Sequence, residues 1–214
     1  MKFIKKILSL ILITAILIGS LTSCKKSLDK YEEDTSTDPK DTYHVAMLVE
    51  DHGIIIVELD AKNAPITVAN FVKLVREGFY DGLTFHRVMN NFMIQGGDPN
   101  ADGTGGSDEK IEGEFLLNGH SNSIKHERGV ISMARSSVSY DSASSQFFIC
   151  NATNSSVSNL DYQYAAFGHV VEGMDVVDSI TSTTAKYADY YSGTIKNKSK
   201  QAVITEMKVI IYEK

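Results

Sequence analysis

The chain has 214 residues, of which 43% are hydrophobic, so it can bury one sizeable core and is too short for two ordinary domains. Its formal net charge is −6, and removal of the first 24 residues, which carry three lysines and no acidic residue, would leave −9. A nucleic-acid-binding surface needs clustered basic residues, so this charge balance argues against nucleic acid as a partner.

The N-terminus has the form of an export signal. Three lysines precede an apolar run from Ile7 to Ile18, and Leu21-Thr22-Ser23-Cys24 follows. The run is shorter than the roughly 20 residues of a membrane-spanning helix, which favours a signal peptide over residues 1–24. The last four residues resemble the bacterial lipobox, which implies a lipid anchor on Cys24, attachment to a membrane and a location outside the cytoplasm. An uncleaved leader, or secretion with Cys24 unmodified, stays open.

The next stretch, residues 25–42, is polar and charged and has few large apolar side chains. This composition predicts a flexible tether, with the folded domain over residues 43–214. The only other cysteine, Cys150, ends the apolar run 147–150 and is predicted to be a small buried residue. Because a lipidated Cys24 could not pair with it, the domain is expected to rely on its core without a disulfide.

The first part of the domain is predicted to be a β-hairpin followed by a helix. Apolar runs at 45–49 and 54–59 flank Asp51-His52-Gly53, a pattern typical of two strands and a tight turn. Pro65 then opens a stretch with apolar residues at helical spacing, and Gly78 follows its charged end. These are the start and stop signals of an amphipathic helix.

The rest of the domain consists of short strand-like runs between loops rich in Gly, Ser and Asn. The runs cover residues 84–88, 93–97, 130–134, 146–149, 165–170 and 202–212, with a second short helix around 174–180. Many short strands with two helices predict a mainly β domain, either a barrel or a sandwich. We expect a binding surface on the two long loops, 98–122 and 135–145, and an extra surface loop at 186–200.

Several short motifs follow one another in an order that is more specific than any one of them. The three longest are Phe85-His86-Arg87-Val88, Phe92-Met93-Ile94-Gln95-Gly96-Gly97-Asp98 and Ser145-Gln146-Phe147-Phe148-Ile149. Shorter ones are Gly103-Thr104-Gly105-Gly106, Ser132-Met133-Ala134-Arg135, Leu160-Asp161 and Phe167-Gly168. Together they resemble the cyclophilin pattern, and the likeness runs from about His44 to the C-terminus.

This resemblance implies a closed eight-stranded antiparallel β-barrel capped by two α-helices, with a substrate groove on its outside. It also implies peptidyl-prolyl cis-trans isomerase activity. The family's catalytic positions match Arg87, Phe92 and Gln95 here, and its substrate-binding positions match Met93, Ala134, Gln146, Phe148, Leu160 and Tyr164. Many cyclophilins carry an aromatic residue just before the Leu-Asp pair, whereas this chain has Asn159, which puts cyclosporin binding in doubt.

The residue types suit the rotation of a peptide bond that precedes proline. Twisting the amide makes its nitrogen pyramidal and frees a lone pair, and the permanently charged guanidinium of Arg87 can donate to it. Gln95 could orient Arg87, while Phe92, Met93, Phe148 and Leu160 could enclose the proline ring. From spacing alone, core packing is the alternative for the aromatic and methionine positions, and a surface salt bridge is the alternative for Arg87.

The sequence thus predicts a monomeric isomerase that acts on proline-containing segments of exported proteins and assists their folding. The alternatives are a non-catalytic chaperone or adaptor lipoprotein that uses the same groove, and, more distantly, a solute-binding lipoprotein. His86 is predicted to be structural, since rotating an amide moves no proton. The histidines and cysteines lack the spacing of zinc sites, so neither a metal nor another cofactor is predicted.

Overall fold

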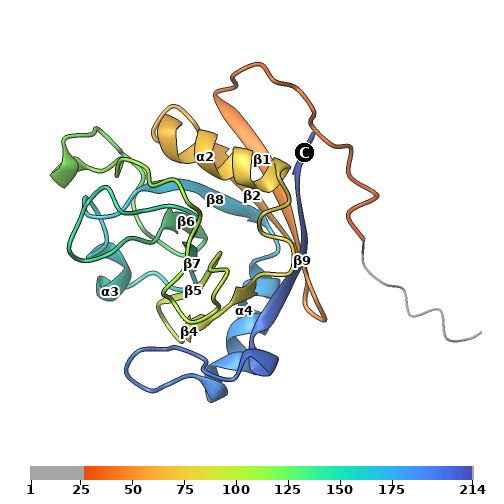
Figure 1. Cartoon of the computed structure of the whole chain (residues 1–214), viewed down its shortest axis with the longest axis vertical. Helices are drawn as coiled ribbons and strands as arrows, with labels where there is room; N and C mark the ends of the chain where they lie inside the picture. Colours follow the sequence, from red (N-terminus) through yellow and green to blue (C-terminus); the bar gives the residue numbers. More distant parts are fainter. Residues whose placement is uncertain (1–26, 214) are drawn as a thin grey trace, which may run out of the picture.

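The computed structural model describes residues 27–213, in which nine antiparallel strands form one sheet that closes nearly into a barrel (Figure 1). The strands are β1 (Thr42–Val49), β2 (Gly53–Asp60), β3 (Thr84–Phe85), β4 (Arg87–Met89), β5 (Met93–Gly96), β6 (Val130–Met133), β7 (Phe147–Cys150), β8 (Ala166–Glu172) and β9 (Ala202–Ile210). Their spatial order is β3-β9-β1-β2-β8-β6-β7-β5-β4. The prediction of a mainly β barrel is confirmed.

The two ends of this order are neighbours in the chain, because only His86 separates β3 from β4. Residues 84–88, which we predicted as one strand, split there: β3 pairs with β9 and β4 pairs with β5. The carbonyl oxygen of His86 accepts a hydrogen bond from the backbone N–H of Ile195 at 2.8 Å. This split explains why nine strands are found where the resemblance implied eight, and it joins the two edges of the sheet covalently.

Aromatic side chains fill the barrel interior. The ring of Phe147 meets the rings of Phe71, Tyr80 and Phe85 edge-on, with centroids 5.5, 5.7 and 6.0 Å apart. All four side chains are fully buried, and burying a phenylalanine stabilises a fold by about 1.5–3 kcal/mol. Since side chains alternate along a strand, the neighbour Phe148 points out of the barrel.

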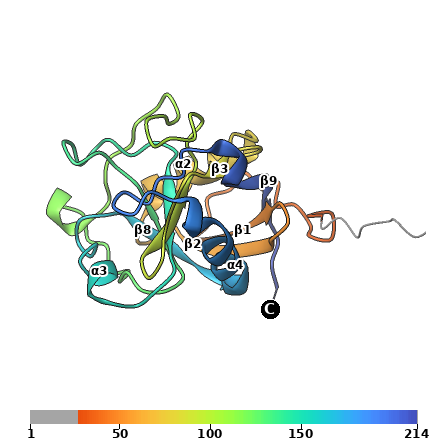
Figure 2. The ribbon, with the colours of Figure 1, turned by 90° about the horizontal axis from the view of Figure 1, so that it is seen from below.

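Helices α2 (Pro65–Arg76) and α4 (Met174–Thr184) close opposite ends of the barrel (Figures 1 and 2). Both were predicted. The first turn of α2 has a proline at its start, and its free N–H groups at Ile66 and Thr67 donate to the buried carboxylate of Glu114 at 3.0 and 2.7 Å. A further one-turn helix, α3 (Ser155–Ser158), was not predicted; the side chain of Asn154 caps it.

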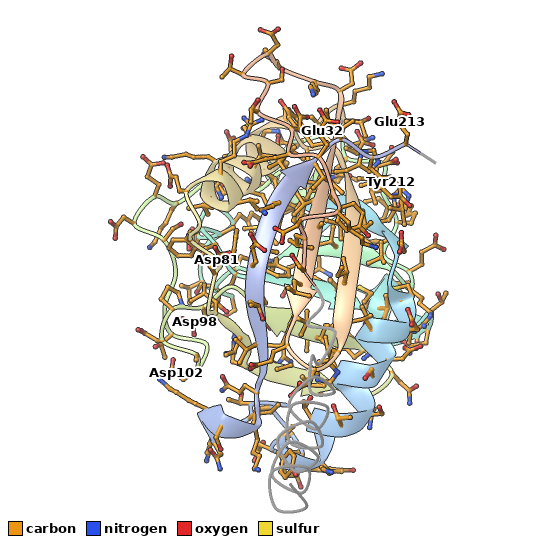
Figure 3. The ribbon with its side chains drawn as sticks, turned by 90° about the vertical axis from the view of Figure 1, so that its right-hand side faces the viewer. Glu32, Asp81, Asp98, Asp102, Tyr212 and Glu213 are labelled. Atoms are coloured by element: carbon orange, nitrogen blue, oxygen red, sulfur yellow. The ribbon has the colours of Figure 1, made fainter. Side chains whose placement is uncertain are left out.

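Residues 27–41 lie against the barrel, so the predicted flexible tether over 25–42 is wrong for this described part. Leu28 is fully buried in a small cluster with residues of β1, β2 and β9. The backbone N–H of Asp34 donates to Val209, and that of Ile211 donates to Glu32, both at 2.9 Å. Figure 3 shows Glu32 beside the C-terminal residues. The folded unit therefore begins near Leu28 and not at residue 43.

The predicted leader lies outside this description. The signal peptide over 1–24 and the lipidated Cys24 fall among residues that the structure does not describe. Within residues 27–213, no helix is both long and apolar enough to cross a membrane. Cys150 is fully buried at the end of β7, as predicted, and burial raises the pKa of its thiol to about 12.

Candidate active site

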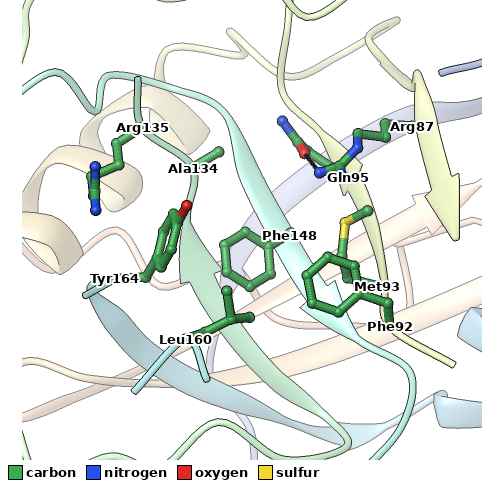
Figure 4. A pocket seen from close by; sticks show the side chains of 9 residues that line it. All are labelled: Arg87, Phe92, Met93, Gln95, Ala134, Arg135, Phe148, Leu160 and Tyr164. Carbon is green, nitrogen blue, oxygen red and sulfur yellow. Dashed lines mark hydrogen bonds between the residues drawn. The ribbon is translucent and has the colours of Figure 1, made fainter. Parts of the chain in front are cut away.

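A pocket of about 150 Å³ opens on the outside of the barrel, over β4, β5, β6 and β7 (Figure 4). We call it the central pocket. Nine residues line it: Arg87, Phe92, Met93, Gln95, Ala134, Arg135, Phe148, Leu160 and Tyr164. Eight of the nine predicted groove positions are in this list. The ninth, Gln146, lies next to it, and Arg135 was not predicted.

Strand alternation helps to explain how residues from five motifs meet here. On β5, Met93 and Gln95 face the pocket, whereas Ile94 between them belongs to the barrel core. The β5–β7 register then sets Gln95 opposite Phe148. A sheet that is buried on its inner face can thus carry a second, outward set of side chains on the same strands.

Arg87 lies at one side of the pocket and has three partners. Its Nη1 donates to Gln95 Oε1 at 3.0 Å, its Nε donates to the carbonyl oxygen of Ser192 at 2.6 Å, and its Nη2 contacts the sulfur of Met89 at 3.2 Å. A guanidinium has five N–H donors, so one on Nη1 and one on Nη2 are left for a ligand. Burial lowers the pKa of Arg87 from its usual value, yet such a group stays charged near neutral pH.

Gln95 is fixed from its other side by Gln146. Its Nε2 donates to Gln146 Oε1 at 2.9 Å, and Gln146 Nε2 donates in turn to the carbonyl oxygen of Gly105 at 2.7 Å. This chain of bonds assigns the orientation of both amides, since each oxygen accepts and each nitrogen donates. Gln146 therefore acts behind Gln95 and does not line the central pocket itself.

The opposite side of the pocket is apolar. Buried Met93 and Phe148 form its floor with Cys150 and Val157 behind them, and half-buried Phe92, Leu160 and Tyr164 form its rim. The rings of Phe148 and Tyr164 meet edge-on with centroids 5.9 Å apart. None of the side chains that line the pocket is a carboxylate. The pocket thus offers an apolar socket beside a donor group.

A buried polar chain supports Phe148 from below. The ring of His126 stacks on Phe148 with centroids 6.1 Å apart. His126 Nδ1 lies 3.1 Å from Asp161 Oδ1, and its Nε2 lies 3.0 Å from the hydroxyl of Ser132. Although the residue types are those of a hydrolase triad, Ser132 is fully buried behind Phe148, so a substrate cannot reach it. We assign this chain a structural role.

Arg135 is enclosed by three aromatic rings. Its guanidinium carbon lies 4.7 Å from the ring centroid of Tyr164, 4.9 Å from Tyr140 and 5.4 Å from Phe115, which are cation–π distances. Its Nε donates to the carbonyl oxygen of Gln163 at 2.9 Å. Its place directly after Ala134 in a recognised motif was the only sequence signal for it.

The two long loops expected to form a binding surface border a second recess. It has a volume of about 430 Å³, adjoins the central pocket through Gln95, and is lined by Gly103–Ser107, Lys110 and Ser136 among others. Asn159, in contrast, is exposed and is not among the residues that line the central pocket. His86 is buried, burial lowers its pKa, and it does not line the pocket either.

The sequence and the fold both have counterparts among known proteins. A family model described as cyclophilin type peptidyl-prolyl cis-trans isomerase/CLD matches residues 44–209. Peptidyl-prolyl cis-trans isomerase A of Dickeya dadantii is 40% identical over 166 residues, covering 77% of this chain and 83% of that protein. Peptidyl-prolyl cis-trans isomerase B of Escherichia coli is 40% identical over 162 residues, covering 72% of this chain and 92% of that protein.

A solved structure adds the three-dimensional comparison. The crystal structure of a Cryptosporidium parvum cyclophilin type peptidyl-prolyl cis-trans isomerase, in the presence of the dipeptide Ala-Pro, matches with a TM-score of 0.66 and 26% identity. The match covers 79% of this chain and 99% of that one. The arrangement of strands found here is thus that of the same fold.

Proposed function

The chain belongs to the cyclophilin-type peptidyl-prolyl cis-trans isomerase family, and from that premise we propose that it isomerises Xaa-Pro bonds of exported proteins with Arg87 as the group that stabilises the twisted amide. The observation that carries this proposal is the guanidinium with two unused donors beside an apolar socket. Proline-containing polypeptides are the corresponding substrates.

The chemical problem is a barrier, not a bond to be broken. Rotation about a peptide bond costs about 18–20 kcal/mol because it removes amide resonance. At the top of the barrier the prolyl nitrogen is pyramidal and its lone pair can accept a hydrogen bond, which the planar amide nitrogen cannot do. A donor placed at that nitrogen binds the transition state more strongly than the ground state, and only such a difference speeds the reaction.

Arg87 is suited to this task by its surroundings. Ser192 and Gln95 hold two edges of the guanidinium, so its plane is fixed while the remaining Nη donors are free to reach the substrate. A donor that is already oriented needs no rearrangement when the amide twists. Phe92 lies under the group, with 6.0 Å between the guanidinium carbon and the ring centroid.

The apolar half of the pocket would hold the proline ring. Met93, Phe148 and Leu160 offer a surface without hydrogen-bonding groups, which suits a pyrrolidine ring and excludes water from one side of the amide. Binding there would set the prolyl nitrogen towards Arg87. The adjoining recess would accommodate residues that flank the proline.

Export and membrane attachment complete the proposal, and both rest on the sequence. A signal peptide over residues 1–24 and a lipid on Cys24 would place the domain outside the cytoplasm, where newly exported chains fold. Slow prolyl isomerisation limits such folding, since it takes tens of seconds or more without a catalyst.

An activity assay tests the role of Arg87. In a protease-coupled assay on a proline tetrapeptide, Arg87→Ala should lower kcat/KM about 100-fold or more, by analogy with removing one donor from an oxyanion site. Arg128→Ala is the matched control, because Arg128 pairs with Asp178 outside the pocket at 2.6 Å. Equal rates for wild type and Arg87→Ala would remove Arg87 from the mechanism. An inactive wild type that still binds proline peptides would favour the adaptor.

Metabolic labelling tests the anchor. Cells grown with a clickable palmitate should label the wild-type protein but not Cys24→Ser. The Cys150→Ser variant should be labelled like wild type, because the thiol of Cys150 is buried and is not expected to carry the lipid. Label that persists in Cys24→Ser would rule out lipidation at that residue.

A further inference from the structure

The predicted extra loop contains a closed turn at residues 189–194, which we call the Asp189 turn. The backbone N–H of Asp189 donates to the carbonyl oxygen of Thr194, and the N–H of Gly193 donates to that of Asp189, both at 2.9 Å. The carboxylate of Asp189 accepts from the N–H groups of Tyr191 at 3.1 Å and Ser192 at 2.9 Å. The bond from Ser192 is the main cause of a lowered pKa for Asp189. The turn is thus tied together internally.

The same turn is fastened to β4. Besides the bond from Arg87 to Ser192, the carbonyl oxygen of Gly193 accepts from the backbone N–H of Val88 at 2.9 Å. Gly193 has a φ of +75°, and a Cβ added there would clash with the side chain of Met89. Only glycine therefore lets the turn approach the strand this closely. The position of the turn relative to the central pocket is fixed.

Two tyrosines project from this turn into solvent. Tyr190 and Tyr191 are 88% and 87% exposed, and their rings pack edge-on with centroids 5.1 Å apart. They immediately precede Ser192, whose carbonyl holds Arg87. Figures 1 and 2 both show the tip of this loop on the side of the molecule where α3 lies. The tyrosine pair is thus joined in sequence to the residue that holds Arg87 at the side of the central pocket.

The charge of the loop that carries the tyrosines differs from that of the whole protein. Residues 186–200 contain four lysines and a single acidic residue, in a chain of net charge −6. None of these lysines forms an ion pair with a carboxylate within residues 27–213. Lys186 and Lys200 lie over the ring of Tyr187, which is half covered, whereas the Tyr190–Tyr191 pair has no such cover.

We propose that the Tyr190–Tyr191 pair is a second contact point for the polypeptide substrate, on the Arg87 side of the central pocket, and that it favours flanking segments with apolar and acidic side chains. This proposal rests on the proposed function and names part of its substrate class. Tyrosine offers a large, rigid contact surface at a small cost in conformational entropy, and the lysines of the same loop attract carboxylates. A polypeptide whose proline is bound beside Arg87 needs only a few residues to reach the pair, at roughly 3.5 Å per residue.

A comparison of short and long substrates tests the contact. The long substrate is a peptide of about twelve residues, which spans roughly 40 Å when extended, with one Ala-Pro bond flanked on both sides by Phe and Glu. The short one is the Ala-Pro tetrapeptide. For each protein the readout is the ratio of kcat/KM for the long peptide to kcat/KM for the short one. The double variant Tyr190→Ser, Tyr191→Ser should lower this ratio about threefold to tenfold.

The controls separate this role from others. Tyr187→Ser removes a tyrosine of the same loop that is half covered and lies under two lysines, and it should keep the wild-type ratio. An unchanged ratio in the double variant, or an equal fall in Tyr187→Ser, would overturn the proposal. A third outcome would also overturn it: wild type binds phosphatidylglycerol vesicles, and the double variant loses this binding but keeps the wild-type ratio. That result would assign the pair to a membrane.

Two further measurements keep the outcomes distinct. Circular dichroism verifies the fold of the double variant, and the single Tyr190→Ser variant replaces it if the fold is lost. Fluorescence anisotropy gives the Kd of the labelled long peptide without any turnover. If wild type fails to isomerise either peptide, the proposed function is wrong, while a Kd that rises in the double variant and not in Tyr187→Ser would still support the contact.

Discussion

Arg87 is held from two sides that differ in their chemistry. On the barrel side the partner is the side chain of Gln95, which the β4–β5 register sets directly opposite. On the other side the partner is the main-chain carbonyl of Ser192 in the Asp189 turn. A side-chain contact can be removed by one substitution at its own position, whereas a main-chain contact is lost only when the turn is deformed. The two supports can therefore be tested separately.

Of the two supports, the barrel-side one should have the larger effect on kcat/KM when it is removed. Gln95→Ala deletes the acceptor for Arg87 Nη1 and the donor to Gln146. A displacement of the guanidinium by about 1 Å would lower kcat/KM roughly 100-fold. Gln163→Ala is a matched control, because its side chain bonds only the Asn159 carbonyl, outside the pocket. A Gln95→Ala variant with wild-type kcat would show that the turn alone positions Arg87.

Loosening the turn should have a smaller effect. Asp189→Ala removes the carboxylate that accepts from Tyr191 and Ser192, while the backbone bonds of the turn remain possible. We expect kcat on the tetrapeptide to fall about threefold to tenfold with little change in KM. Asp189→Asn keeps an acceptor oxygen and should restore most of the rate. If Asn and Ala variants are equally impaired, the side chain does not act through these bonds.

Mild acid should lower the free energy of unfolding through His126 under the pocket floor, and not through Asp189 in the turn. Burial lowers the pKa of His126 under the pocket floor, although Asp161 beside it acts in the opposite direction and Lys125 in the same one. The pKa of His126 in the folded protein lies below the unfolded value of about 6.5. The neutral ring therefore makes its full contribution to the free energy of unfolding above that pH. Its contribution is lost as the pH falls towards the folded value. Asp189, with its lowered pKa, stays ionised over this range.

The expected change in the free energy of unfolding is small. From about pH 7.5 to about pH 5.5, the free energy of unfolding attributable to His126 should fall by at most about 1.4 kcal/mol, the limit that the unfolded pKa of about 6.5 sets. Urea unfolding of wild type and His126→Gln at both pH values measures it, and the variant should show the weaker pH dependence. His169→Gln, at an exposed position, is the control. The same slope in His126→Gln and wild type would contradict the assignment.

The two supports of Arg87 also differ in whether the sequence could predict them. Gln95, Met93 and Phe148 were predicted because they lie in short local motifs that resemble the cyclophilin pattern. The strand break at His86 depends on Ile195, and the hold on Arg87 depends on Ser192; both are remote in sequence and act through backbone atoms. No residue pattern marks such contacts.

Other features were missed for related reasons. The support of Phe148 by His126, Ser132 and Asp161 joins three separate segments, each unremarkable alone. The packing of residues 27–41 rests on Leu28 and on backbone bonds, so a polar composition concealed it. Composition describes the average of a segment, whereas a single buried leucine is enough to dock it.

The packing of residues 27–41 against the barrel limits the length of chain between a lipid on Cys24 and the folded domain. With a lipid on Cys24, only four peptide steps separate the anchor from buried Leu28, a reach of roughly 14 Å. The domain would then lie directly at the bilayer surface and could not move far from it. Since the N-terminal segment and α3 lie on opposite sides of the molecule in Figures 1 and 2, the groove would face away from the lipid, towards arriving chains.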